Sequence, residues 1–254
     1  KVEFIHIPKN YFQKLHLMVA SNLTPDVVFI NNLSGTLYAE NNVFRDLSDY
    51  LKNDDTLTEK DFFPQALKAF TYKGLFYAIP RDISNLVVYY NKSIFDRYNV
   101  PYPHEDWTFA EFIQTCRKLT KDLNGDGKID QFGISFEEAP LFWLPYLWSN
   151  GGGVISKNLD SIIINKPQSI EALQFYADLR NKYHVAPTKS EAGSATMAQL
   201  FMQEKIAMHI SGRWSTPRYR KDITFKWDIA KFPRSKDGSI VDCDTSGWAI
   251  SSSS

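Results

Sequence analysis

The hydrophobic pattern is clearest at residues 86–90, LVVYY, where five apolar residues follow one another without interruption. Such a run predicts a strand buried on both faces, as in a parallel or mixed sheet that helices cover. Arg81, Asp82, Ser84 and Asn85 come just before it. Charged and amide side chains so close to a buried strand indicate a cleft, and the alternative is a plain turn that leads into a core strand.

The first thirty residues have the pattern of a strand, a helix and a second strand. Residues 1–8 alternate as in a strand, Asn10 precedes a helical pattern that it is predicted to cap, and 27–30 is a second apolar run. A short crossover of this kind predicts a βαβ unit. Ligands of such sheets lie at the carboxyl ends of strands, which makes Asn31 and Asn32 candidate site residues. An Asn-rich turn is the alternative.

Later segments carry local signals for helices, strands and turns. Thr108 and Glu111 form a capping box, and Trp107 and Phe112 fit a hydrophobic staple, so Trp107 is predicted to be structural. Pro167 opens a long helix with a predicted buried stripe of Ile170, Leu173, Tyr176, Leu179 and Tyr183. Further predictions are a short helix or turn at 47–51, a helix capped by Thr58, a hairpin at 70–79, helices at 94–98 and 195–203, and strands at 205–210 and 227–230.

Composition excludes some functions and leaves others open. The 29 basic and 29 acidic residues balance, so there is no basic field to hold a nucleic acid. With 254 residues and 43% hydrophobic content, the chain has enough apolar surface for one large or two modest domains. Aromatic residues make up 15%, and their rings serve both as core and as flat platforms for sugars. No apolar run is long enough to predict a membrane span, and the pattern of these residues does not predict a signal peptide.

The sequence gives few signs of a metal site or of a disulfide. Residues 122–130, DLNGDGKID, resemble a calcium loop with oxygen ligands at alternate positions, but Gly133 stands where a bidentate Glu is expected, so a metal-free turn is the alternative. The three glycines at 151–153 lack the Lys-Ser/Thr of a phosphate loop and predict a tight turn out of a helix. Cys116 falls on an apolar helix face and is predicted to be a buried thiol, although a lone bridge to Cys243 stays open.

Three stretches, taken together and in order, resemble one family. They are 77–92 (YAIPRDISNLVVYYNK), 143–153 (WLPYLWSNGGG) and 201–214 (FMQEKIAMHISGRW). Each is similar to a motif of the extracellular solute-binding proteins of ABC importers, in the carbohydrate-binding, maltose-binding-protein-like cluster. Two residues of the third stretch depart from the family pattern, since Glu204 replaces a Gly and Arg213 replaces a Pro.

The resemblance implies an α/β fold of the periplasmic-binding-protein type (type II), with two lobes joined by a hinge. Its boundaries would be 1–83 with 244–254 for the first lobe and 84–243 for the second, with a return crossing near 246–251. Family members carry a secretion signal and a lipid-modified Cys before this region and continue beyond it. The resemblance therefore implies a chain cut at both ends, with uncovered apolar surface that promotes association.

The resemblance also implies site residues. The residue that matches Asp82 hydrogen-bonds the sugar, and the Trp that matches Trp214 stacks on it. Trp143 and Trp148 compete for a second ring facing the cleft, and one of them is expected to be core. The other candidates are Asn31, Asn32 and Arg81 as hydrogen-bonding partners and Trp248 in the return crossing.

The predicted function is to bind a carbohydrate between two lobes and deliver it to the transmembrane subunits of an ABC permease, outside the cell or in the periplasm, held to the membrane through an N-terminal lipid anchor. No cofactor and no metal are expected. An enzyme is not expected, because no second carboxylate accompanies Asp82 in a comparable motif, and no nucleophile elbow, HExxH or Walker loop occurs. The alternatives are a binder of a polyamine or phosphate ester or, less favoured, a carbohydrate-active enzyme.

Overall fold

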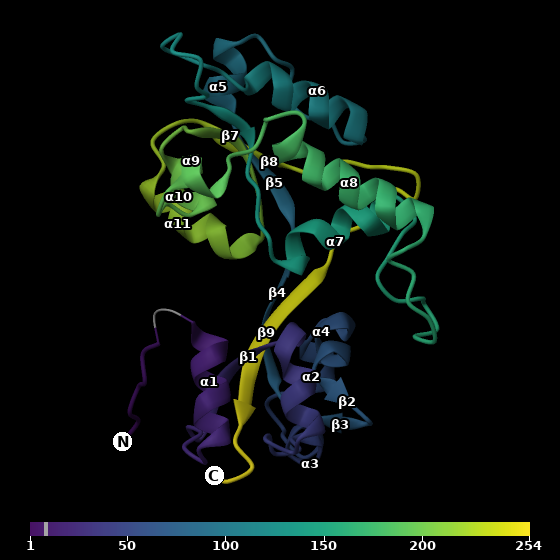
Figure 1. The fold of residues 1–254 in the computed structure, drawn as a ribbon. Coiled ribbons are helices and arrows are strands. Elements are labelled where there is room, and N and C mark those ends of the chain that lie inside the picture. Colours follow the sequence, from purple (N-terminus) through teal and green to yellow (C-terminus); the bar gives the residue numbers. More distant parts are fainter. Residues whose placement is uncertain (8–9) are drawn as a thin grey trace. The chain divides into compact units, whose positions relative to one another are not determined.

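The computed structural model describes residues 1–7 and 10–254, which form two compact units (Figure 1). Unit 1 consists of Lys1–Ser84 and Cys243–Ser254, and unit 2 consists of Asn85–Asp242. Unit 2 is therefore one continuous stretch of chain, whereas unit 1 combines two stretches that are far apart in the sequence.

Unit 1 is built on a three-stranded sheet in the order β1-β9-β4. Strands β1 (Val27–Asn31) and β9 (Cys243–Ile250) are antiparallel, and β4 spans Ile79–Asn85. The predicted hairpin is confirmed as β2 (Thr71–Tyr72) and β3 (Leu75–Phe76). The helices are α1 (Tyr11–Ala20), α2 (Asn32–Glu40), α3 (Ser48–Lys52), α4 (Pro64–Ala69) and the short 3-10 helix Glu59–Asp61.

For the N-terminal segment, the predicted helix and second strand are confirmed as α1 and β1, but the predicted first strand, Asn10 cap and βαβ unit are wrong. Residues 1–7 form no strand, Val2 and Phe4 are exposed, and Pro8 lies outside the described residues. Because β1 pairs with β9 and not with an earlier strand, there is no βαβ unit here. Alternation alone does not make a strand when no core covers one of its faces. Asn10 precedes α1, but it has a left-handed backbone and makes no side-chain capping bond.

Unit 2 is built on a four-stranded mixed sheet in the order β6-β7-β5-β8. Its interior strand β5 (Val87–Asn91) confirms the predicted buried run and lies antiparallel to β7 (Ile206–Ser211) and β8 (Trp227–Ala230). The short strand β6 (Phe132–Ile134) is parallel to β7. All six residues of β7 are buried, so this strand runs through the core of unit 2.

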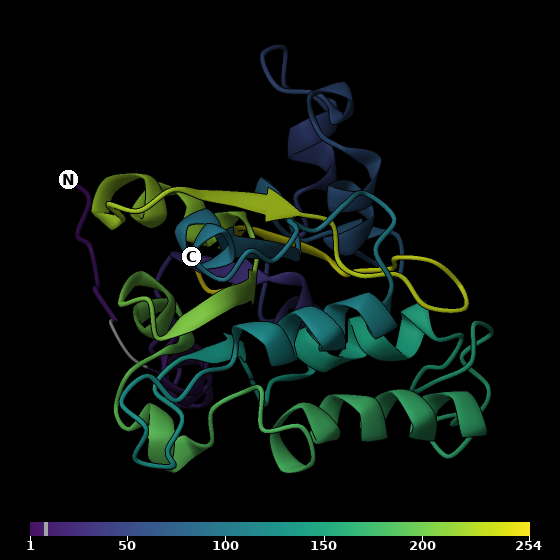
Figure 2. The same cartoon turned by 90° about the horizontal axis from the view of Figure 1, so that it is seen from above.

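Helices and caps of unit 2 follow local signals. Thr108 and Glu111 form the predicted capping box of α6 (Phe109–Leu119), and Trp107 is buried against Phe112 as predicted. Cys116 of α6 is buried, as predicted. Helices α7 (Pro140–Ser149) and α8 (Pro167–Asn181) pack together (Figure 2). The other helices are α5 (Lys92–Arg97), α9 (Lys189–Ala192), α10 (Met197–Met202), α11 (Thr216–Asp222) and the 3-10 turn Arg213–Ser215.

The buried face of α8 differs in part from the prediction. Tyr176 and Leu179 are buried as expected, but Ile170 is 54% exposed, and the small residues Ser169 and Ala172 are buried in its place. Close packing explains the difference: a Cβ added at Gly152 would lie 2.7 Å from Ser169 Oγ, so the chain passes too close to this face for a large side chain.

Candidate functional site

A pocket of about 310 Å³ lies within unit 2, beside the carboxyl end of β7. An aromatic ring from each of two segments, Phe142 and Trp214, and one carboxyl group, Glu137, contribute to its wall. The other lining residues are Thr196, Ala198, His209, Ser211, Ser215, Arg218 and Tyr219.

Trp214 is the predicted site residue that lines this pocket, and it is 45% exposed. The turn Arg213–Ser215 carries it immediately after β7, so the Arg in place of a Pro still permits a turn here. The ring lies against Gly212, where an added Cβ would come within 2.0 Å of a ring carbon. Gly212 is therefore required for the position that Trp214 takes.

Hydrogen bonds from buried side chains support the same turn. The Tyr89 hydroxyl donates to the carbonyl oxygen of Gly212 at 3.0 Å and lies 2.7 Å from Thr216 Oγ1. Ser211 Oγ and Ser215 Oγ are 2.8 Å apart and tie the end of β7 to the end of the turn. Both ends of the segment that carries Trp214 are thus fixed from the core side.

The floor of the pocket contains a neutral histidine. His209 is 3% exposed, and its Nδ1 is hydrogen-bonded to the Tyr219 hydroxyl. Burial lowers the pKa of His209 to about 3, so the imidazole is uncharged at neutral pH. This ring supplies polarity without charge beneath the pocket.

Glu137 was not predicted as a site residue. It lies in the loop between β6 and α7, and burial raises the pKa of its carboxyl group, an effect that Arg180 partly offsets. Among the described residues, the hydrogen bonds of Glu137 are made by its backbone, with the Tyr176 hydroxyl. Its carboxyl group thus lines the pocket while other groups hold the main chain. No local pattern in the sequence marks Glu137, because its placement depends on Tyr176, which is 39 residues away.

Trp143 and Trp148, two of the predicted rings, do not line this pocket. Trp143 is half-buried and packs against the core of unit 2, so its neighbour Phe142 provides the ring at this position. Trp148 lies one and a half helical turns further along α7 and is also half-buried. A ligand-binding role for either tryptophan stays a prediction.

In unit 1, Asp82 lies at the junction of β4 and β9. Its Oδ1 accepts hydrogen bonds from the backbone N–H (3.2 Å) and hydroxyl (2.6 Å) of Ser246, and its Oδ2 accepts from Nη2 of Arg81 at 2.6 Å. Burial alone would raise the pKa of Asp82, but the bonds from Ser246 and Arg81 outweigh it and hold the pKa below its usual value. Asp82 is therefore an ionised, fixed acceptor.

Asn31 and Asn32 have structural partners in unit 1. Asn31 caps α2, since its Oδ1 accepts from the backbone N–H (3.1 Å) and hydroxyl (2.6 Å) of Ser34. Asn32 donates from Nδ2 to the carbonyl of Cys243 and accepts from the N–H of Thr245, both at 3.4 Å. Asn31 is thus a helix cap, and a ligand role for either residue stays a prediction.

Trp248 and Arg81 flank one phenylalanine in unit 1. Trp248 of β9 lies opposite Phe29 of β1, their rings are 6.0 Å apart, and Trp248 is 44% exposed. The Arg81 guanidinium lies 5.2 Å from the centre of the same Phe29 ring. The structure thus brings Trp248, Arg81 and Asp82 together on unit 1, where the partly exposed Trp248 is the large apolar side chain of the group.

The loop at 122–130 uses its carboxylates internally. Asp122 accepts the N–H groups of Gly125 (2.7 Å) and Gly127 (2.9 Å), and Asp130 accepts that of Leu123 at 2.7 Å. Within the described part of the chain, no three His, Cys, Asp or Glu residues are grouped as metal ligands. The same described residues include no helix of sufficient length and apolarity to cross a bilayer.

Comparison with known proteins identifies the family. The profile of the bacterial extracellular solute-binding proteins matches residues 1–254. The chain belongs to this family. The maltotriose-binding protein of Pyrococcus abyssi is 27% identical over 196 residues, which are 77% of this chain and 39% of that protein.

Solved structures share the fold. An ABC substrate-binding protein of Listeria monocytogenes in complex with cycloalternan superposes with a TM-score of 0.88 at 28% identity, over 97% of this chain and 62% of that one. The maltose/maltodextrin-binding domain of Bdellovibrio bacteriovorus bound to maltotriose gives 0.78 at 24% identity, over 94% and 60%. The chain thus has the α/β fold of the substrate-binding proteins and spans less than two thirds of the length of these relatives.

Proposed function

We propose that this chain is part of an extracellular substrate-binding protein of an ABC importer, and that its solute is a carbohydrate. The observation that carries the proposal is the pocket of unit 2, which the half-exposed Trp214 and the acidic Glu137 both line. A sugar offers an apolar C–H face to a ring and hydroxyl groups to a carboxylate, so it satisfies both.

Units 1 and 2 would act as the two lobes, with the boundaries at 84/85 and 242/243 as the hinge crossings. Unit 1 would contribute Trp248, Arg81 and Asp82, and unit 2 would contribute Trp214 and Glu137. A ligand that contacts both lobes favours the form in which all contacts are made, and this closed form would deliver the sugar to a membrane permease. Attachment to the membrane through a lipid anchor belongs to the same proposal.

The rival functions fit the pocket less well. A polyamine would pair with Glu137, but Arg218 lines the same pocket and opposes a polycation. A phosphate ester would suit Arg218 but is opposed by Glu137. A glycosidase needs two carboxyl groups on either side of one bond, and among the described lining residues Glu137 is the one carboxyl group.

Thermal unfolding with a panel of solutes tests the proposal. Linear and cyclic α-glucans and β-mannosides would be compared with spermidine and glycerol phosphate. A sugar present at about one hundred times its Kd should stabilise the protein by about 2.7 kcal/mol, and the sugar should be recovered unchanged. A shift with spermidine or glycerol phosphate alone, or cleavage of the sugar, would contradict the proposal.

A further inference from the structure

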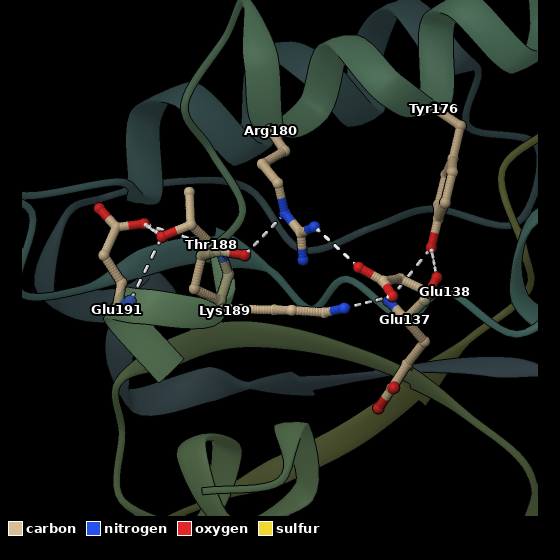
Figure 3. Close-up of polar contacts among 8 residues, drawn as sticks. Glu137, Glu138, Tyr176, Arg180, Thr188, Lys189 and Glu191 are labelled. Atoms are coloured by element: carbon tan, nitrogen blue, oxygen red, sulfur yellow. Dashed lines mark hydrogen bonds and ion pairs between the residues drawn. The ribbon is translucent and has the colours of Figure 1, made fainter. Parts of the chain in front are cut away.

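One hydroxyl group holds both main-chain groups of Glu137. Tyr176 Oη of α8 donates to the carbonyl oxygen of Glu137 at 2.6 Å and accepts from its N–H at 3.2 Å (Figure 3). A tyrosine hydroxyl has one donor and can accept at the same time, so a single side chain satisfies both groups. Tyr176 is 39 residues away from Glu137 in the sequence, so these two hydrogen bonds depend on the fold and not on neighbouring residues. We call this pair of bonds the clamp.

The clamp itself cannot swing aside. Tyr176 is 6% exposed, its ring stacks on Phe136 at 4.4 Å, and its centre lies 4.9 Å from that of Tyr146. The Arg180 guanidinium lies 3.9 Å from the centre of the Phe136 ring. Two residues one turn apart on α8, Tyr176 and Arg180, thus hold the segment before α7.

The next residue, Glu138, is held by a different set of contacts. Its carboxylate pairs with Lys189 Nζ at 2.8 Å and with Arg180 Nη1 at 3.4 Å, and Arg180 Nε donates to the carbonyl of Pro187 at 3.0 Å. In Figure 3 the carboxyl group of Glu137 points away from these contacts. The two glutamates are therefore separated, one toward surface cations and the other toward the pocket.

On the other side, the same loop is fixed to β7. The N–H of Ser135 donates to the carbonyl of Met208, and Ser135 Oγ accepts from the N–H of Ile210, both at 3.0 Å. Residues 135–139 have no helix or strand of their own. Between Ser135 and the ion pairs of Glu138, the bonds from Tyr176 are the ones that hold the main chain of Glu137 itself.

We propose that Tyr176 is the positioning residue for Glu137: its hydroxyl fixes the main chain so that the Glu137 carboxyl group enters the pocket and receives the ligand. The inference deepens the proposed function and rests on it for the nature of the ligand. Tyr176 does not touch the ligand; it acts through Glu137. It is thus a determinant of affinity that is placed on a core helix.

The experiment compares Tyr176→Phe with Tyr183→Phe. The first keeps the stacked ring and removes both hydrogen bonds to Glu137. The second removes a hydroxyl from a neighbouring tyrosine that lies outside the pocket and contacts Arg117 through its ring. Affinity for the sugar found by thermal unfolding should fall about five- to tenfold in Tyr176→Phe and stay unchanged in Tyr183→Phe.

A double-mutant cycle separates positioning from a merely structural role. If Tyr176 acts through Glu137, then Tyr176→Phe should change affinity little once Glu137 is replaced by Ala. Equal losses in both backgrounds, or unchanged affinity in Tyr176→Phe when Glu137→Ala binds weakly, would overturn the inference.

A second readout needs no ligand. In protein with ¹³C-labelled glutamate, NMR titration gives the pKa of Glu137, which should move toward its ordinary value in Tyr176→Phe and stay raised in Tyr183→Phe. If no sugar binds the parent protein, the proposed function fails on its own, and this titration still decides the inference. An unchanged Glu137 pKa in Tyr176→Phe would overturn it.

Discussion

At the scale of single residues, two tryptophans of unit 2 have opposite environments. Trp107 is 2% exposed, packs on Phe112 and donates from Nε1 to the carbonyl of Lys231 at 2.8 Å. Trp214 is 45% exposed and lines the pocket. Trp107→Ala should therefore lower the free energy of unfolding by about 3–5 kcal/mol. Trp214→Ala should weaken sugar binding about tenfold or more and leave stability nearly unchanged. Calorimetric titration and urea unfolding of both variants test this, and comparable losses of stability would contradict it.

Gly212 provides a further prediction at this scale. Gly212→Ala adds a Cβ that would lie 2.0–2.4 Å from three atoms of the Trp214 ring, so the ring must move. Sugar affinity should fall as far as in Trp214→Ala, and the fluorescence of Trp214 should shift even without ligand. The double variant provides the control, because Gly212→Ala should add little when Trp214 is already Ala. An unchanged spectrum would show that the ring does not depend on this glycine.

His209 gives a pH dependence of stability. Its pKa falls to about 3 in the folded protein from an ordinary value near 6.5, so between these values the unfolded chain binds the proton and the folded protein does not. Above pH 6.5 the histidine is neutral in both states and does not lower the free energy of unfolding. As the pH falls from 6.5 toward 3, the free energy of unfolding decreases by up to about 1.4 kcal/mol per pH unit, because the unfolded chain takes up the proton. Glu137, whose pKa is raised, has the opposite slope, so the test is the difference between the parent and His209→Asn in unfolding from pH 7 to 4.5. A parallel pH profile in both proteins would contradict the assignment.

At the scale of elements, helix α6 depends on its cap. Thr108 Oγ1 accepts from the N–H of Glu111 at 3.2 Å, and the Glu111 carboxylate accepts from the N–H of Thr108 at 2.7 Å. Hydrogen bonds from His104 and Thr108 lower the pKa of Glu111 to about 2, so this half of the cap stays ionised in mild acid. Thr108→Ala should cost about 1 kcal/mol of stability and Thr108→Ser much less, as measured by urea unfolding. Equal losses in both variants would assign the effect to the methyl group instead.

Elements of this kind were predictable because their signals are local. The capping box of α6, the hairpin around Lys73 and the buried run of β5 all lie within a few residues of sequence. The prediction of a strand at residues 1–8 is wrong, because an alternating segment becomes a strand only if a distant segment pairs with it.

The residues of the candidate site also differ in whether the sequence predicts them. Trp214 was predicted from a motif around it, whereas Glu137 becomes a site residue through contacts with Tyr176 and β7, which no local pattern reveals.

At the scale of the whole molecule, the two units differ in how they are assembled from the chain. Unit 2 is continuous, and its sheet, its core and the pocket with Trp214 and Glu137 all come from Asn85–Asp242. The middle strand of the unit 1 sheet is β9, which pairs with β1 in a register that joins Val27 to Ile250. Unit 1 therefore cannot complete its sheet without residues from the far end of the chain.

This difference predicts opposite behaviour of two fragments. Residues 85–242, produced alone, should unfold cooperatively in urea and should retain weak, Trp214-dependent sugar binding, because they contain the whole pocket. Residues 1–84 should not unfold cooperatively, since without β9 the strands β1 and β4 have no common neighbour. Addition of a peptide covering 243–254 should restore some structure to 1–84, because it supplies the missing strand. Circular dichroism of each fragment measures the outcome. Cooperative unfolding of 1–84 alone, or a disordered 85–242, would show that stability is not divided between the units in this way.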